Sequence, residues 1–280
     1  MPFAIYLPFF PGHQPNLLFS RESPIDDYDT YLELAAATRS AGVFTSELPA
    51  DGAVLDAGCG GGRWIVWLHK HGRRVAGLDL FLPVLQGLRR QVPAIPLLQG
   101  RVTALPVADN SLAGIVSLGV VEHDEAGPDA ALREFARALK PGGRLLLSVP
   151  FSNVVRRVVM HRLIRRYHAA RAGDGYYFVE YRFTRAEILE AVRRCGLRPR
   201  SCHPHDFLPP RNMGLVSDFN ILATHFIRRE NELHLHLPVY RLEGELPGWR
   251  GVVARVVSRL SQWFAAAEIL VVAEKAGGPP

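Results

Sequence analysis

Short apolar runs alternate with segments of helical periodicity from about residue 52 onward. The apolar runs predict strands over Ala53–Asp56, Arg74–Asp79, Ile95–Gln99, Gly114–Leu118 and Arg144–Val149. The 3.6-residue spacing between them predicts helices over Arg63–His71, Leu82–Gln91 and Pro128–Leu139. Near-continuous apolar strands separated by helices indicate a mostly parallel sheet that is covered on both faces. The expected fold class is therefore α/β, with a doubly wound sheet.

Turn and helix-capping residues predict where the later helices and strands begin and end. Pro141-Gly142-Gly143 is expected to stop the helix that precedes the fifth strand. Thr184 to Glu187 has the form of a capping box and opens a helix that is expected to end at Gly196. Further strands are predicted over Leu197–Phe207 and Glu268–Glu274.

The regular alternation does not begin at the first residue. We expect residues 1–45 to form an N-terminal extension that is loop-rich up to Asp27, with a helix over Tyr31–Ala41. Residues 46–280 then form the main domain, interrupted by insertions at about 151–183 and 207–264.

Composition places the chain among folded proteins of a reducing compartment. Hydrophobic residues make up 48% of the 280 residues and charged residues 21%, and no apolar run reaches the roughly 18–20 residues that a membrane span needs. Three cysteines are too few for a disulfide framework. Arginine outnumbers lysine, as in proteins of GC-rich bacterial genomes. The expected location is the bacterial cytoplasm.

The net charge of +6 can be assigned to one segment of the chain. Between Phe151 and Ala172 stand six arginines and no acidic residue, so this segment alone equals the whole excess. A local cluster differs from the overall basicity of a nucleic-acid-binding protein.

A glycine-rich loop follows the first predicted strand. In VLDAGCGGGRW, residues 54–64, the glycines permit tight turning and close backbone approach to a ligand, before a helix whose N-terminus favours negative charge. A dinucleotide fingerprint that begins at Gly58 requires a third glycine at position 63, where the chain has Arg63. The pattern D-x-G-x-G-x-G, which begins at Asp56, is matched in full.

With these motifs the chain resembles the class I S-adenosylmethionine-dependent methyltransferases, and within them the ubiquinone-biosynthesis branch. Asp79 ends the second strand in VAGLDL, where the family has an acidic residue. LPVADNSLAGIVSLGVVEH (105–123) and ALKPGGRLLLSVP (138–150) are similar to two further family blocks. The resemblance implies a Rossmann-like sheet of seven strands, with Glu268–Glu274 as the antiparallel seventh strand and an inserted helical lid.

The resemblance also implies where S-adenosyl-L-methionine binds. Gly58 and Gly60 would line its methionine end, Asp79 would accept hydrogen bonds from the ribose hydroxyls, and Leu118 would lie near the sulfonium. At Arg101 the family often has an aspartate that contacts adenine, and because arginine cannot accept a hydrogen bond, backbone groups near Val102 would hold the adenine. The full set of implied cofactor-binding residues is Asp56, Gly58, Cys59, Gly60, Gly62, Asp79, Leu80, Arg101, Val102, Leu118 and Gly119. Within it, Cys59 is interpreted as a small filler and not as a nucleophile.

Candidate catalytic and metal-binding residues are few. His123, just after the fourth strand, is the nearest general base on sequence position, with a structural role as the alternative. Cys202, His203 and His205 lack a second ligand pair at metal-site spacing, so no metal is expected. The chain has SLGV where amino-directed nucleic-acid methyltransferases have N/D-P-P-Y/F, and it has no Pro-Cys pair, so nucleic acid is not expected as the acceptor.

The arginine-rich insertion is the main sequence clue to the acceptor. Val155, Val159, Leu163 and Tyr167 recur every four residues, with Val158, Met160 and Ile164 alongside, and arginines fill the rest of the helical wheel, as in a basic amphipathic helix. We interpret it as a lid whose apolar stripe packs on the core, and a peripheral contact with an anionic inner membrane face stays compatible. A second amphipathic segment spans Val252–Phe264.

The sequence thus predicts an S-adenosylmethionine-dependent methyltransferase that modifies a small or lipid-linked acceptor, most plausibly at oxygen. The alternatives are a non-catalytic protein that binds the same cofactor and an NAD-dependent oxidoreductase. The oligomeric state stays open.

Overall fold

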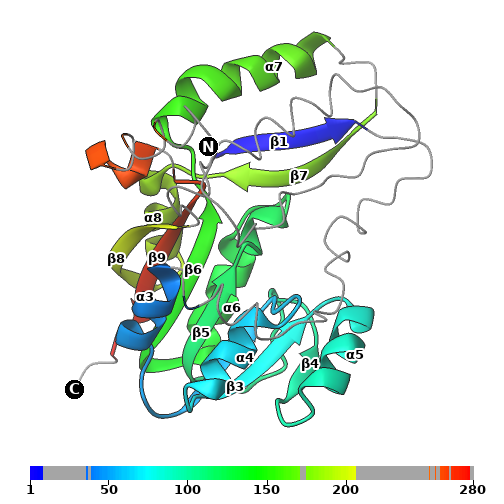
Figure 1. The fold of residues 1–280 in the computed structure, drawn as a ribbon, viewed down its shortest axis with the longest axis vertical. Helices are drawn as coiled ribbons and strands as arrows, with labels where there is room; N and C mark the ends of the chain where they lie inside the picture. The colour runs from blue at the N-terminus through cyan, green and yellow to red at the C-terminus, as the bar shows by residue number, and fades with distance from the viewer. Residues whose placement is uncertain are drawn as a thin grey trace.

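The computed structural model describes residues 1–8, 36, 39–170, 175–205, 252, 256, 259–264 and 266–277. Within them the chain forms a large sheet flanked by helices and, above one end of it, a small sheet with a helix of its own (Figure 1). Phe207 and most of the predicted insertion 207–264 lie outside the described residues.

The large sheet has seven strands in the order β4-β3-β2-β5-β6-β9-β8. All neighbouring strands are parallel except β9, which runs antiparallel to both β6 and β8. The seven strands are β2 (Ala53–Ala57), β3 (Arg74–Asp79), β4 (Leu97–Gln99), β5 (Leu112–Leu118), β6 (Leu139–Pro150), β8 (Leu197–His205) and β9 (Glu268–Lys275). The predicted fold class and the antiparallel seventh strand are confirmed.

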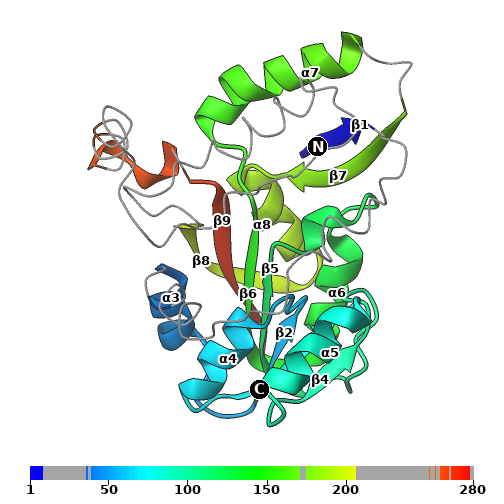
Figure 2. The same cartoon turned by 45° about the vertical axis from the view of Figure 1, so that its right-hand side comes forward.

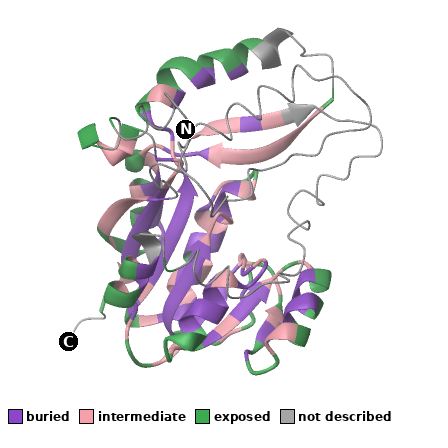
Figure 3. Ribbon diagram, in the orientation of Figure 1, coloured by how far each residue is buried: buried purple, intermediate pink, exposed green. Residues whose placement is uncertain are grey.

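Helices cover both faces of this sheet, because side chains alternate along each strand (Figures 2 and 3). Leu55 of β2 belongs to the core under α6 and α8, whereas its neighbour Val54 belongs to the core under α3, α4 and α5. The helices are α3 (Arg39–Glu47), α4 (Arg63–Lys70), α5 (Leu82–Gln91), α6 (Asp129–Ala138) and α8 (Arg185–Arg194). Such a two-faced core is what a doubly wound sheet requires.

Local signals account for several helix ends. Thr184 Oγ1 accepts from the backbone N–H of Glu187 at 3.3 Å, and Glu187 Oε2 accepts from the backbone N–H of Thr184 at 2.9 Å, so the capping box is confirmed. The predicted helix over Pro128–Leu139 is confirmed as α6, which ends at Ala138. Pro141-Gly142-Gly143 lies within β6, which starts at the next residue, Leu139, with an irregular register opposite β5.

A second, two-stranded sheet forms above the carboxyl ends of β5 and β6. We call it the upper sheet: β1 (Phe3–Pro8) pairs antiparallel with β7 (Tyr176–Arg182). Over it lies the basic helix, which consists of a π-helical turn, η2 (Arg156–Met160), followed by α7 (His161–Ala170) (Figure 1). The prediction of loop at the start of the chain is therefore wrong for β1, whose pairing partner lies about 175 residues away in sequence.

The predicted helix Tyr31–Ala41 overlaps the observed helix α3 only in its last three residues. The described helix α3 starts at Arg39 and continues to Glu47, beyond the predicted boundary. Residues 31–35 of the prediction lie outside the described residues.

The buried face of the basic helix differs from the predicted stripe. Val159 is 46% exposed and Leu163 38% exposed, whereas Arg156, Met160 and Ile164 are buried. The stripe is displaced by one residue because the Arg156 guanidinium is drawn inward, where its Nη1 donates to the carbonyls of Phe151 and Ala267 at 2.8 and 2.7 Å. Met160 and Ile164 then pack on Ile5 of the upper sheet. The helix does cover the core, but with a different face.

Candidate functional site

The glycine loop folds across the end of the neighbouring strand β3. The backbone N–H groups of Gly58 and Cys59 both donate to the carbonyl of Leu78, at 2.7 and 2.9 Å. Gly58 has φ +90°, and a Cβ at this position would lie 2.4 Å from Val120 Cγ2. Only glycine fits here, because the backbone is left-handed and the space is already taken.

Asp79 is held against this loop. Its Oδ2 accepts from the backbone N–H of Gly60 at 2.9 Å, and its Oδ1 accepts from the backbone N–H of Phe81 at 2.9 Å. A carboxylate has about four acceptor sites on its two oxygens. Each oxygen of Asp79 can therefore accept a further hydrogen bond, and a diol such as a ribose matches that geometry.

The helix after the loop begins without a side-chain cap. Gly62 occupies the N-cap position of α4 with φ +82° and has no side chain that could cap the helix. A Cβ at Gly62 would lie 2.5 Å from Leu88 Cδ2, so α4 and α5 approach closely at this point. The first backbone N–H groups of α4 thus face the loop and give it a partial positive charge.

The residues after Asp79 lead from the end of β3 towards the end of β4. Leu80 is 46% exposed, and its carbonyl accepts from Gln99 Nε2 at 3.3 Å. The backbone N–H of Gly100 donates to the carbonyl of Asp79 at 3.0 Å, which brings Arg101 and Val102 to the same end. Arg101 is exposed, whereas Val102 is half-buried against the core.

The end of β5 lies at the other side of the loop. Leu118 is half-buried, and Gly119 turns away with φ +67° while its N–H donates to the carbonyl of Ser148 at 3.2 Å. His123 lies four residues after Gly119, and its Nδ1 is 2.8 Å from the carbonyl of Val179 in β7. This contact ties the imidazole to the upper sheet.

Two of the sequence-predicted residues are interior. Asp56 is only 3% exposed at the end of β2. The Cys59 thiol is buried, and its Sγ lies 2.9 Å from where a Cβ at Gly77 would stand. Cys59 therefore fills the space that Gly77 leaves open, which favours the interpretation of this cysteine as a filler.

Sequence reasoning missed a pair of carboxyls at the same edge. Glu122, in the short 3₁₀ turn η1 (Val121–His123), is 2% exposed, and burial together with the charges of Glu268 and Glu180 raises its pKa well above the ordinary value. Burial likewise raises the pKa of Glu268, at the start of β9. The only sequence signals were an acidic residue beside His123 and one that opens a strand.

The histidines and cysteine near the end of β8 do not converge. His203 Nε2 lies 2.9 Å from Ser201 Oγ, and His205 Nε2 lies 3.8 Å from Glu268 Oε2. In the described part of the chain no group of three or more His, Cys, Asp or Glu side chains is arranged to hold a metal ion.

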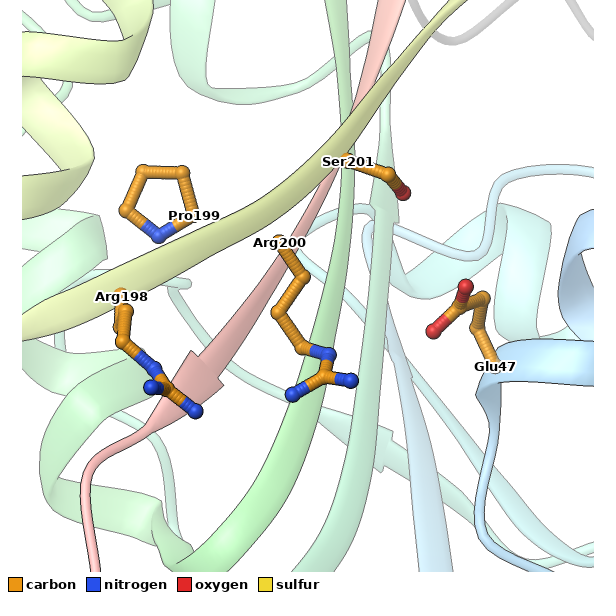
Figure 4. Close-up of a pocket in the computed structure, with 5 residues that line it drawn as sticks. All are labelled: Glu47, Arg198, Pro199, Arg200 and Ser201. Carbon is orange, nitrogen blue, oxygen red and sulfur yellow. The ribbon is translucent and has the colours of Figure 1, made fainter.

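A separate pocket of about 300 Å³ lies at the opposite end of the sheet (Figure 4). It is lined by Glu47 of α3 and by residues 198–201 of β8. Its arginines are already paired, since Arg198 and Arg200 donate to the two oxygens of Glu274 at 3.1 and 2.9 Å. Ligands of open α/β sheets bind at the carboxyl ends of the strands, where the glycine loop lies, and not at this end.

Comparisons with known proteins agree with the fold and the loop. A family model described as a methyltransferase domain matches residues 55–147. The chain is 30% identical to the ubiquinone/menaquinone biosynthesis C-methyltransferase UbiE of Syntrophotalea carbinolica, over 67% of this chain and 87% of that protein. It is 35% identical to the malonyl-[acyl-carrier protein] O-methyltransferase of Yersinia pestis, over 46% of this chain and 48% of that protein.

Among solved structures, the geranyl diphosphate C-methyltransferase of Streptomyces coelicolor A3(2) superimposes with a TM-score of 0.52 at 16% identity, over 85% of this chain and 75% of that chain. A doubly wound sheet with a glycine loop and an acid at the end of the next strand defines a nucleoside-binding α/β protein. The chain belongs to the class I S-adenosylmethionine-dependent methyltransferase family. It spans only 37% to 48% of the length of the first curated relatives that it matches.

Proposed function

We propose that this protein transfers the methyl group of S-adenosylmethionine to the oxygen of a small or lipid-linked acceptor. The contact between Asp79 Oδ2 and the Gly60 N–H, at 2.9 Å, carries the proposal. It joins the two chemical features that this cofactor needs, a bare backbone loop and a ribose-binding carboxylate, into one unit. The same joining supports the cofactor roles of the other loop residues.

The chemistry is a displacement at the methyl carbon of a sulfonium, which the bound cofactor supplies. The task of the protein is then to align the acceptor with that carbon and to exclude water. Leu118 and Gly119 at the end of β5 form the boundary between the loop and the region under the upper sheet. The acceptor would enter there, beneath the basic helix.

Oxygen is the acceptor atom in this proposal, and the relatives include enzymes that act on oxygen and on carbon. The Yersinia pestis relative is an O-methyltransferase, whereas the Syntrophotalea carbinolica relative is a C-methyltransferase. Two carboxyls with raised pKa, Glu122 and Glu268, lie at the carboxyl edge of the large sheet beneath the upper sheet, which we call the acceptor edge. They favour an acceptor that must lose a proton. We propose a small or lipid-linked substrate in the bacterial cytoplasm and not nucleic acid, because the chain has SLGV where amino-directed nucleic-acid methyltransferases have N/D-P-P-Y/F.

Removal of the Asp79 carboxylate tests the proposal. We expect S-adenosylhomocysteine to bind the wild type with a micromolar dissociation constant and to bind Asp79→Ala at least about 30-fold more weakly, because two charge-assisted hydrogen bonds are lost. Isothermal titration calorimetry measures both constants.

Asp51→Ala is the matched control, since this exposed carboxylate lies at the opposite end of β2. Equal affinity in Asp79→Ala and Asp51→Ala would contradict the ribose assignment. Preferential binding of NAD(H) would instead support an oxidoreductase. Tight binding without transfer to any hydroxyl or carbon acceptor would support a non-catalytic protein.

We further propose that the outer face of the basic helix contacts an anionic membrane. Its exposed side chains combine apolar residues with cations: Val158 is 52% exposed, Val159 46% and Leu163 38%, and Arg157, Arg162, Arg165 and Arg166 are exposed beside them. Apolar insertion and attraction to anionic lipid act together on such a face. No described helix is long and apolar enough to cross a bilayer.

Flotation with lipid vesicles tests this contact. At low salt we expect vesicles with about 30% phosphatidylglycerol to recruit the protein, and neutral phosphatidylcholine vesicles to leave it in solution. Replacing three arginines of the exposed face by glutamine is expected to lower the partition coefficient at least about tenfold. The three are Arg157, Arg162 and Arg166.

A control with the same loss of charge replaces exposed arginines outside the basic helix. These are Arg90, Arg133 and Arg193. If both triple variants lose recruitment equally, general charge and not this face is responsible. If anionic vesicles fail to recruit the wild type, the membrane contact is refuted while the methyltransferase proposal stands.

A further inference from the structure

Two carboxyl side chains lie at the acceptor edge of the large sheet. Ligands of open α/β sheets lie at the carboxyl ends of the parallel strands. Two carboxyls, Glu122 and Glu268, come from elements that lie at that edge. Glu122 comes from the turn after β5, and Glu268 from the start of β9, opposite Pro150 of β6 and His205 of β8.

Glu122 lies directly behind the turn that ends β5. Its Oε1 is 3.6 Å from the point where a Cβ at Gly119 would stand. Its Oε2 has no hydrogen-bond partner among the described residues, although the side chain is only 2% exposed. A buried oxygen of a carboxyl without a partner costs free energy, so proteins retain such a group where it serves a ligand.

Glu268 is connected to the same turn through Ser148. Its Oε2 accepts from Ser148 Oγ at 2.7 Å, and the carbonyl of the same Ser148 accepts from the Gly119 N–H at 3.2 Å. About a quarter of the Glu268 side chain stays exposed. Ser148 thus fixes the positions of Glu268 and of the Gly119 backbone relative to each other.

The surrounding charges leave this pair only partly compensated. Glu180 of β7 has its own cation, because Arg182 Nε donates to its Oε1 at 3.1 Å. Arg156 and Arg63 lower the pKa of Glu268 and oppose the effect of burial. His123 Nε2 lies 3.8 Å from Glu122 Oε1, so Oε2 is the oxygen of Glu122 that is left to accept from a ligand.

We propose that Glu122 is the base that takes the acceptor's proton, an inference that rests on the proposed function. In the step, the acceptor oxygen forms a bond to the methyl carbon while the bond from that carbon to sulfur breaks. The acceptor's O–H proton passes to the Glu122 carboxylate. The sulfonium loses its positive charge as the carboxylate loses its negative charge, so the site stays electrically balanced.

A cofactor analogue tests this without knowledge of the acceptor. Sinefungin carries an amine at the point where the cofactor carries its transferable methyl, whereas S-adenosylhomocysteine carries nothing there. If Glu122 faces that point, the wild type is expected to bind sinefungin about tenfold more tightly than S-adenosylhomocysteine, as a charge-assisted hydrogen bond provides. In Glu122→Gln the ratio is expected to fall to within about twofold of one, with the affinity for S-adenosylhomocysteine unchanged.

Three further variants make the result specific. Glu122→Met, which keeps the volume and removes both oxygens, is expected to lose the preference as Glu122→Gln does, and it serves if the glutamine variant fails to fold. Glu122→Asp, which keeps the charge, is expected to retain part of the preference. Glu125→Gln changes an exposed neighbour and is expected to leave the ratio unchanged.

The outcomes separate the two proposals. If the wild type binds neither sinefungin nor S-adenosylhomocysteine, the proposed function fails. If both bind and the ratio is the same in Glu122→Gln, Glu122→Met and the wild type, the proposed function survives and the base assignment is overturned. If the Glu122 variants weaken every ligand by one common factor, Glu122 is a structural residue and the assignment is likewise overturned.

Discussion

Gly58→Ala is expected to lower the affinity for S-adenosylhomocysteine about 10- to 100-fold and the free energy of unfolding by roughly 2–4 kcal/mol. Two effects add at this position. The backbone has φ +90°, which alanine adopts only with strain, and the new Cβ would lie 2.4 Å from Val120 Cγ2. Because Val120 adjoins Gly119, relief of the clash moves the glycine loop or the end of β5. Calorimetry and urea denaturation measure the two quantities.

Gly72→Ala is the matched control for this prediction. Gly72 also has a positive φ, +74°, but a Cβ there would meet no atom within 4 Å. It is expected to cost about 1 kcal/mol through backbone strain alone and to leave cofactor affinity unchanged. If the two variants behave alike, the close approach of the loop to Val120 has no energetic consequence.

Arg156→Met is expected to destabilise the fold by roughly 2–5 kcal/mol. The guanidinium is 2% exposed, and its Nη1 donates to the carbonyls of Phe151 and Ala267. Methionine fills a similar volume but donates nothing, so two carbonyls at the junction of β6, β9 and the basic helix each lose one donor. The backbone N–H groups of Asn153 and Phe151 still donate to them. The midpoint of urea denaturation, with the slope held constant, reports the change.

The neighbouring residue provides the comparison. Arg157 lies in the same π-helical turn and has the same charge, but its side chain is exposed. Arg157→Met is expected to change stability by less than about 0.5 kcal/mol. A similar loss in both variants would show that the basic helix, and not the buried pair of hydrogen bonds, sets the stability.

The large sheet was predictable because its signals are local. Each parallel strand is an apolar run bounded by turn residues, and Thr184 with Glu187 marks a helix start that the structure confirms. The glycine loop and Asp79 were found for the same reason, since the motif is contiguous and the acid ends a strand. The 2.9 Å contact between Gly60 and Asp79 follows from parallel neighbours whose ends must meet.

The upper sheet and the carboxyl pair were not predictable in this way. β1 pairs with β7, and Glu268 lies beside a residue 120 positions away, Ser148. No local pattern encodes such distant pairings. The buried face of the basic helix was misplaced by one residue because hydrophobic periodicity assigns arginine to water, whereas Arg156 satisfies two interior carbonyls.

The two sheets divide the molecule into parts whose sequences can diverge at different rates during evolution. The proposed cofactor contacts come from loops of the large sheet, whereas β1, the basic helix and β7 lie above the acceptor edge. They join the large sheet through contacts such as that of His123 Nδ1 with the carbonyl of Val179. Substitutions in these pieces can reshape which molecule is admitted while nucleoside affinity persists. Grafting the upper sheet and its helix between family members is therefore a rational route to new selectivity.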